Sequence, residues 1–121
     1  LQKSLGSKEK DKCYLIVKYF SANPTTHPLP MITATLYNFF SKVFIYQSFR
    51  AGNDREMCAA MGINPFFLQD YKVAASNYPR QKLEDVIGIL NAYDLKSKGV
   101  ESGAASGGEL LREMVIKILD P

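Results

Sequence analysis

The sequence contains no tryptophan, one histidine and two cysteines, and this scarcity limits the chemistry that the chain can perform. His27 stands alone, and Cys13 and Cys58 lie far apart, so the chain has no His/Cys set with the spacing of metal ligands. A phosphate-binding Gly-x-x-x-x-Gly-Lys-Ser/Thr loop and a Ser–His or Cys–His pairing are also missing. We therefore expect no catalytic, cofactor-binding or metal-binding residue here, no enzyme activity of the chain alone, and a solvated loop position for His27.

Long hydrophobic runs and strong charge are missing as well. No segment approaches the roughly 18 uninterrupted apolar residues of a membrane span, so no membrane partner is expected. The net charge of +3 is too mild to indicate nucleic acid by itself. Distant cysteines without a paired motif predict reduced thiols in a cytoplasmic protein. Because the chain begins at Leu1 and not at Met, we also expect it to be cut from a longer protein.

Helical periodicity is present along most of the chain. Asn53, Asn64 and Ser106 are predicted N-caps, Ser7 is predicted to cap the first helix, and Gly62 ends a short one. No alternating strand pattern appears, and a Gly- and Ser-rich stretch over 99–108 is expected to be a mobile loop. The prediction is an all-α single compact bundle over residues 7–121, with 1–6 as the tail of a preceding linker. Its six helices are expected at about 7–20, 31–51, 55–61, 65–75, 79–98 and 107–119.

One apolar stripe carries an acid and a base at its end. The predicted stripe consists of Leu83, Val86, Ile87, Leu90, Asp94 and Lys98. Asp94 stands four residues before Lys98, the orientation in which a carboxylate and an ammonium meet on a helix. The pair is either packed and structural or an ordinary solvated pair, and the spacing alone favours the solvated pair.

Aromatic residues provide the candidate interface. The segment 31–51 is apolar nearly all round, which is typical of a central helix or of a helix with a second face for another chain. Its Phe-rich face is assigned to the core. Aromatic side chains concentrate at interfaces, so we take the remaining ones, with the Phe pair that follows Asn64-Pro65, as candidates. They are Tyr37, Tyr46, Phe49, Phe66 and Phe67.

Residues 55–71 also have the outline of a helix-turn-helix. Cys58 lies four residues before the glycine of the turn, and apolar residues follow it. The first turns of the second helix, however, offer Gln69 and Asp70 after two phenylalanines, with Lys72 as the only cation. We therefore prefer two packed helices, and keep a helix-turn-helix DNA-binding regulator as the alternative function.

Several short motifs together resemble one family. They are Leu5-Gly6-Ser7-Lys8, Tyr19-Phe20 with Asn23-Pro24, Asn38-Phe39-Phe40-Ser41, Met61-Gly62 followed by Asp70-Tyr71, Asp94 with Lys98-Gly99, and Glu109-Leu110-Leu111. In this order and spacing, residues 1–121 resemble the C-terminal part of the bacterial DNA polymerase III delta subunit, a clamp-loader component. The Asn-Pro loop and the Phe-Phe pair look most like the versions found in Bacteroidetes.

The resemblance implies a helical collar domain that supports assembly of the loader that places the sliding clamp on DNA during replication. In this family the collar packs against those of the other loader subunits, of gamma/tau and delta-prime type. The upstream nucleotidase-like and lid domains are absent from this chain, so the sliding clamp and DNA would be reached only through the full-length assembly. The family's D-x-x-x-K arrangement implies that Asp94 and Lys98 are a packed structural pair.

Overall fold

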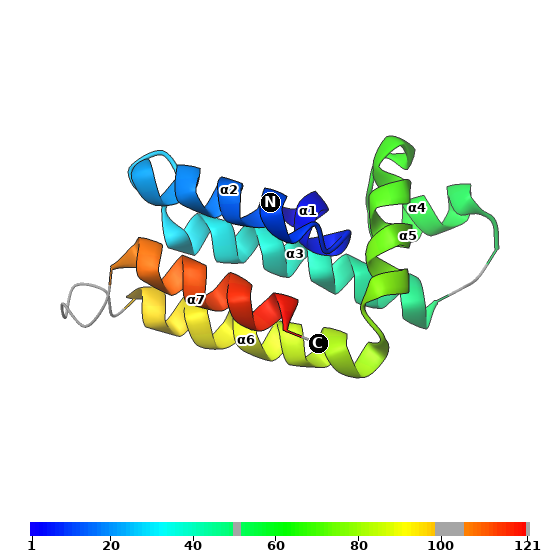
Figure 1. The fold of residues 1–121 in the computed structure, drawn as a ribbon. Helices are drawn as coiled ribbons and strands as arrows, with labels where there is room; N and C mark the ends of the chain where they lie inside the picture. Colours follow the sequence, from blue (N-terminus) through cyan, green and yellow to red (C-terminus); the bar gives the residue numbers. More distant parts are fainter. Residues whose placement is uncertain (50–51, 99–105, 121) are drawn as a thin grey trace.

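Four of the helices lie along one long axis of the molecule, and each is antiparallel to the next of these four along the chain (Figure 1). The computed structural model describes residues 1–49, 52–98 and 106–120. Within these residues every regular element is helical and no strand occurs, which confirms the all-α bundle. The elements are α1 (Gln2–Gly6), α2 (Lys10–Ala22), α3 (Leu29–Ser48), α4 (Asp54–Met61), the 3-10 helix η1 (Pro65–Phe67), α5 (Leu68–Asn77), α6 (Arg80–Lys98) and α7 (Gly107–Leu119).

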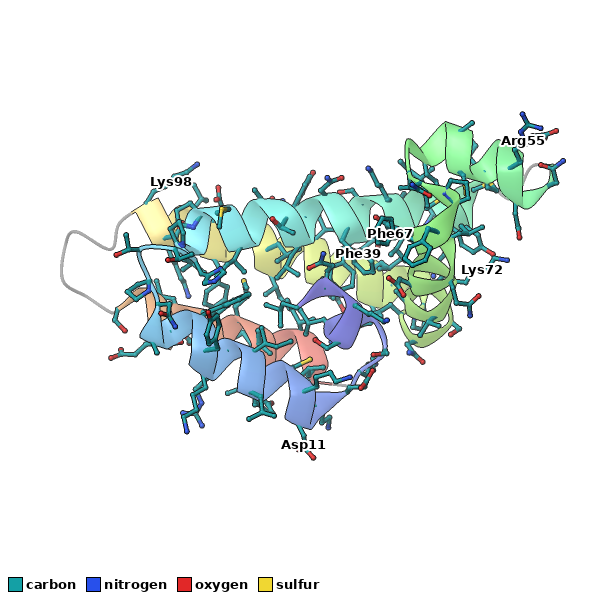
Figure 2. The ribbon with its side chains drawn as sticks, turned by 90° about the horizontal axis from the view of Figure 1, so that it is seen from above. Asp11, Phe39, Arg55, Phe67, Lys72 and Lys98 are labelled. Carbon is teal, nitrogen blue, oxygen red and sulfur yellow. The ribbon has the colours of Figure 1, made fainter. Side chains whose placement is uncertain are left out.

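The main core lies between two layers of helices. Helix α3 packs on α6, and α2 packs on α7, while α6 and α7 join the layers (Figures 1 and 2). The buried residues of α3 recur at helical spacing and include Leu36, Phe40 and Val43, which confirms that its Phe-rich face belongs to the core. None of the helices in the described residues combines the length and hydropathy of a membrane span.

A smaller cluster lies at one end of the molecule, where α4 and α5 pack against the last turns of α3. Its buried members are Met57, Cys58, Met61 and Leu68. Cys13 belongs to the main core instead. Both cysteines are buried free thiols, which confirms the prediction that they form no disulfide.

The N-terminal segment differs from the sequence expectation. Residues 2–6 form α1, and Leu5 is fully buried in the main core. The hydroxyl of Tyr78 donates to the Leu5 carbonyl at 2.6 Å, and the amide of Asn77 donates to the Gly6 carbonyl at 3.0 Å. Ser7 closes α1, and α2 begins at Lys10, so the prediction of Ser7 as an N-cap is wrong and residues 1–6 are no trailing linker.

The other caps follow the sequence. The side chains of Asn53, Asn64 and Ser106 accept backbone N–H groups at 2.9, 2.9 and 3.1 Å. Gly62 ends α4 with φ +69°, a left-handed conformation that glycine adopts without strain. Pro65, however, opens a 3-10 turn before α5 begins at Leu68.

The predicted mobile loop is shorter than expected at its C-terminal end. Gly107 and Gly108 form the first turn of α7, because the Ser106 side chain caps that helix. Residues 99–105 lie outside the described residues, so the expectation of mobility there stays a prediction.

Candidate functional site

Asp94 and Lys98 form an ion pair with 3.1 Å between Oδ2 and Nζ. The Thr33 hydroxyl of α3 donates to the other carboxylate oxygen at 3.1 Å, a partner that the sequence did not indicate. Lys98, and secondarily Thr33, lower the pKa of the Asp94 carboxyl. The carboxylate therefore links the last turns of α6 to α3.

The pair lies at the rim of α6 and not on its buried stripe. Its side chains are 37% exposed for Asp94 and 65% exposed for Lys98. The buried stripe continues from Leu90 through Tyr93 to Ser97 instead, because helical positions 3 to 4 residues apart share a face. The predicted stripe is therefore wrong in its last two members. Ile87 is half-buried beside it.

Tyr37 lies near the pair. A hollow of about 300 Å³ opens between α3 and α6, and its lining includes Thr33, Tyr37, Asn91 and Asp94. The structure thus brings one predicted interface residue and the predicted acid to the same surface, although they are 57 positions apart, from 37 to 94 in the chain.

The remaining candidate interface residues lie at the α4 end. Phe66 is 82% exposed, and Phe67 packs edge-to-face against it with ring centroids 5.3 Å apart. Phe49 caps α3 and is also exposed. Tyr46 is half-buried against the smaller cluster. Tyr37 and Phe49 are separated by about 18 Å along α3. The five candidates therefore occupy two surfaces, with Tyr37 on one and the other four at the α4 end.

The helix-turn-helix outline is present in α4, η1 and α5, but its second helix lacks a basic face. Lys72 donates to Asp54 of α4 at 2.9 Å, and this hydrogen bond raises the pKa of Lys72. The exposed positions of α5 are Gln69 and Ser76. The only cation of α5 is therefore engaged within the protein.

The described residues are expected from the sequence to hold no metal, and the side chains that could ligate one lie apart. The described part of the chain contains no group of three or more His, Cys, Asp or Glu side chains that could hold a metal ion. His27 is half-buried and stacks on Phe20 with ring centroids 4.2 Å apart, so the expectation of a solvated loop histidine is wrong.

Sequence reasoning missed a groove between α2 and α7. It is about 950 Å³ in volume, and Tyr14, Lys18, Arg112 and Ile116 are among the residues that line it. The sequence signal that could have indicated this groove is a large apolar residue on the outward face of each helix, Tyr14 on α2 and Ile116 on α7.

No family model, curated protein or solved structure matches the chain.

Proposed function

We propose that the chain is the collar domain of a clamp-loader delta subunit, an interaction domain that holds the loader together during DNA replication. The family comes from the motif resemblance, and the observation that carries the interaction role is the exposed Phe66–Phe67 pair at the α4 end. Large aromatic side chains exposed on a rigid helical body are typical of the anchors of protein interfaces.

The proposed partners are the gamma/tau and delta-prime type subunits, in the cytoplasm. The domain contributes geometry and no ATP hydrolysis of its own, while the sliding clamp and DNA are reached through the full-length subunit. An interface of this kind buries roughly 1,200–2,000 Å² in total, and its aromatic anchors lie near the centre.

The DNA-binding regulator gains little support from α5, which presents one exposed glutamine and no free cation. Sequence-specific recognition needs Arg, Lys, Asn or Gln directed at base edges from the first turns of the second helix. Here Lys72 is paired with Asp54, and the exposed side chains next to it in the sequence are Phe66, Phe67 and a single candidate base-reading residue, Gln69. An interaction domain explains exposed aromatic residues at this place better than a base-reading helix does.

The test is co-purification of loader subunits with the full-length delta subunit. Phe66→Ser/Phe67→Ser should abolish assembly with the gamma/tau and delta-prime type subunits and leave binding to the sliding clamp intact. Deletion of residues 31–121 should have the same outcome. Met31→Ser/Leu95→Ser removes two other exposed apolar side chains and serves as the matched control.

Normal stoichiometry of the Phe66/Phe67 variant contradicts the proposed surface, and normal stoichiometry of the deletion contradicts the collar assignment. Sequence-specific DNA binding by the 121-residue chain would support the regulator.

A further inference from the structure

The groove between α2 and α7 extends along most of both helices. Its larger part is lined by Tyr14, Val17 and Lys18 of α2 and by Arg112 and Ile116 of α7. A second hollow of about 250 Å³ includes Tyr14 and Ile116 in its lining as well, so the two hollows adjoin. Helices α2 and α7 lie side by side on one side of the bundle, away from the projecting α4 (Figures 1 and 2).

The floor of the groove is apolar and partly open to solvent. Tyr14 is 38% exposed and Ile116 is 44% exposed, and Val17 beneath them is buried in the main core. At the start of α7 the two helices touch, since a Cβ on Gly108 would lie 3.0 Å from the Ser21 Cβ. The helices are in contact at Gly108, and larger side chains separate them further along, which opens the groove.

Cations stand at both ends of this apolar floor. Lys18 and Arg112 line the larger part, and Lys10 and Lys117 line the second hollow. None of the four makes an ion pair with a described residue. Lys117 does contact a ring, since its Nζ lies 5.3 Å from the centroid of the Tyr93 ring. The groove therefore presents an apolar strip flanked by four positive charges that no described carboxylate neutralises in an ion pair.

Two carboxylates also line the groove, and they do not cancel this charge. Asp120 lies beyond the last turn of α7. Glu109 lies in the first turn of α7, where the positive end of the helix dipole offsets a carboxylate. Among the described residues, four cations against two carboxylates leave the lining positive.

We propose that the α2–α7 groove binds an acidic amphipathic helix of a partner protein. From Lys10 to Ser21 the groove follows α2 for about 16 Å, which accommodates roughly three turns of a helix. An apolar face fills a groove between two helices, and acidic flanks would meet the cations. The single aromatic residue on the floor, Tyr14, gives little stacking surface for nucleotide bases, so the observations favour a helix over a nucleic acid.

This inference does not rest on the collar assignment. It uses none of the aromatic residues at the α4 end, and it predicts a second contact on a different side of the bundle. The Phe66/Phe67 test and the following test can therefore fail separately.

The test uses synthetic helical peptides of about 14 residues, which is close to four turns. One peptide has leucines on one face and glutamates on both flanks, a second has lysines in place of the glutamates, and a third is a scrambled glutamate version. With the 121-residue chain, the glutamate peptide should bind at least about tenfold more tightly than the others in fluorescence anisotropy. Backbone amide NMR shifts on titration should concentrate on α2 and α7.

Charge reversal gives the decisive variant. Lys18→Glu/Arg112→Glu should exchange the preference, so that the lysine peptide binds more tightly than the glutamate peptide. Lys3→Glu/Arg55→Glu changes the net charge equally on α1 and α4 and should keep the original preference; Figure 2 shows Arg55 at the far end of the molecule. All four side chains are exposed, and circular dichroism verifies that both variants are folded.

Equal binding of the glutamate and lysine peptides, absence of binding, or NMR shifts outside α2 and α7 would each overturn the proposal. Displacement of the glutamate peptide by a single-stranded oligonucleotide at lower concentration would assign the groove to nucleic acid and overturn it as well. If the Lys3→Glu/Arg55→Glu control also loses the preference for the glutamate peptide, the preference comes from net charge alone, and the proposal is overturned.

Discussion

Tyr78 joins parts of the chain that are distant in sequence. Its hydroxyl donates to the Leu5 carbonyl of α1, its ring packs edge-to-face on Phe40 of α3, and Gln47 of α3 donates to its backbone carbonyl at 2.6 Å. Burial raises the pKa of the Tyr78 phenol, so the hydroxyl stays protonated and remains a hydrogen-bond donor at neutral and moderately alkaline pH. One side chain thus fixes α1 to the junction between α5 and α6.

Replacing Tyr78 by phenylalanine tests that junction. Tyr78→Phe removes one of the two donors to the Leu5 carbonyl, which keeps the Lys8 N–H at 3.1 Å, so the free energy of unfolding should fall by about 0.5–1.5 kcal/mol. Urea denaturation measures the loss. Tyr37→Phe removes the same atom from an exposed ring and should change stability by less than about 0.5 kcal/mol. Equal effects of the two variants would contradict this role for Tyr78.

Two glycines in helices predict opposite effects of the same substitution. A Cβ on Gly6 would lie 3.0 Å from the Ala74 Cβ and 3.3 Å from the Phe39 ring, so Gly6→Ala should destabilise by about 1–3 kcal/mol. Gly88 lies within α6 with no atom within 4 Å of an added Cβ. Gly88→Ala should stabilise by about 0.5–1 kcal/mol through helix propensity. Thermal melts of the two variants should move in opposite directions.

At the scale of elements, the end of α6 is held to α3 through Asp94. The carboxylate accepts from Thr33 and pairs with Lys98, and both partners favour its charged form. Asp94→Ala leaves both partners without that carboxylate. The loss of stability in Asp94→Ala/Lys98→Ala should therefore be smaller than the sum of the losses in the two single variants, and a double-mutant cycle measures this coupling. A coupling indistinguishable from zero would indicate an ordinary solvated pair.

The same carboxylate predicts a pH dependence. Because the pKa of Asp94 is lowered in the folded state, the unfolded chain binds the proton first as the pH falls. The stabilisation is complete above the ordinary pKa of aspartate and is lost as the pH falls through the lowered value. The stability difference between the wild type and Asp94→Asn should therefore be largest near neutrality and shrink in acid. Urea denaturation over this pH range verifies it, and a difference that grows in acid would contradict it.

At the scale of the whole molecule, the two hydrophobic clusters predict unequal local stability. The main core joins six helices, whereas the smaller cluster has four buried residues in α4 and α5. Elements with few buried contacts open at lower free energy. Cys58 of the smaller cluster should therefore react with a thiol reagent before Cys13 of the main core. Mass spectrometry of timed alkylation distinguishes the two sites, and faster labelling of Cys13 would contradict the difference.

The parts of the fold that the sequence predicted are those set by nearby residues. Asn53 and Ser106 cap helices through contacts within three positions, and helical periodicity placed the core face of α3. The errors concern distant partners. Ser7 has the local pattern of an N-cap, but it closes α1, whose Leu5 carbonyl accepts from the distant Tyr78. The predicted stripe of α6 did not include Tyr93, which the structure buries in the main core.

In the candidate site, too, the sequence predicted the local contacts and missed the contacts between distant residues. The spacing of Asp94 and Lys98 predicted their ion pair, but the third partner, Thr33, comes from another helix 61 positions away. The α2–α7 groove depends on how two helices from opposite ends of the chain pack together, and no local pattern specifies that.

The position of α1 has a consequence for synthesis on the ribosome. Leu5 emerges first, but the hydroxyl that it accepts from belongs to a residue 73 positions later. At a synthesis rate of about 5–20 residues per second, roughly 4–15 s pass between the two. During that interval α1 lacks the part of its docking site that α5 supplies, so this early helix reaches its native place only after α5 has been made.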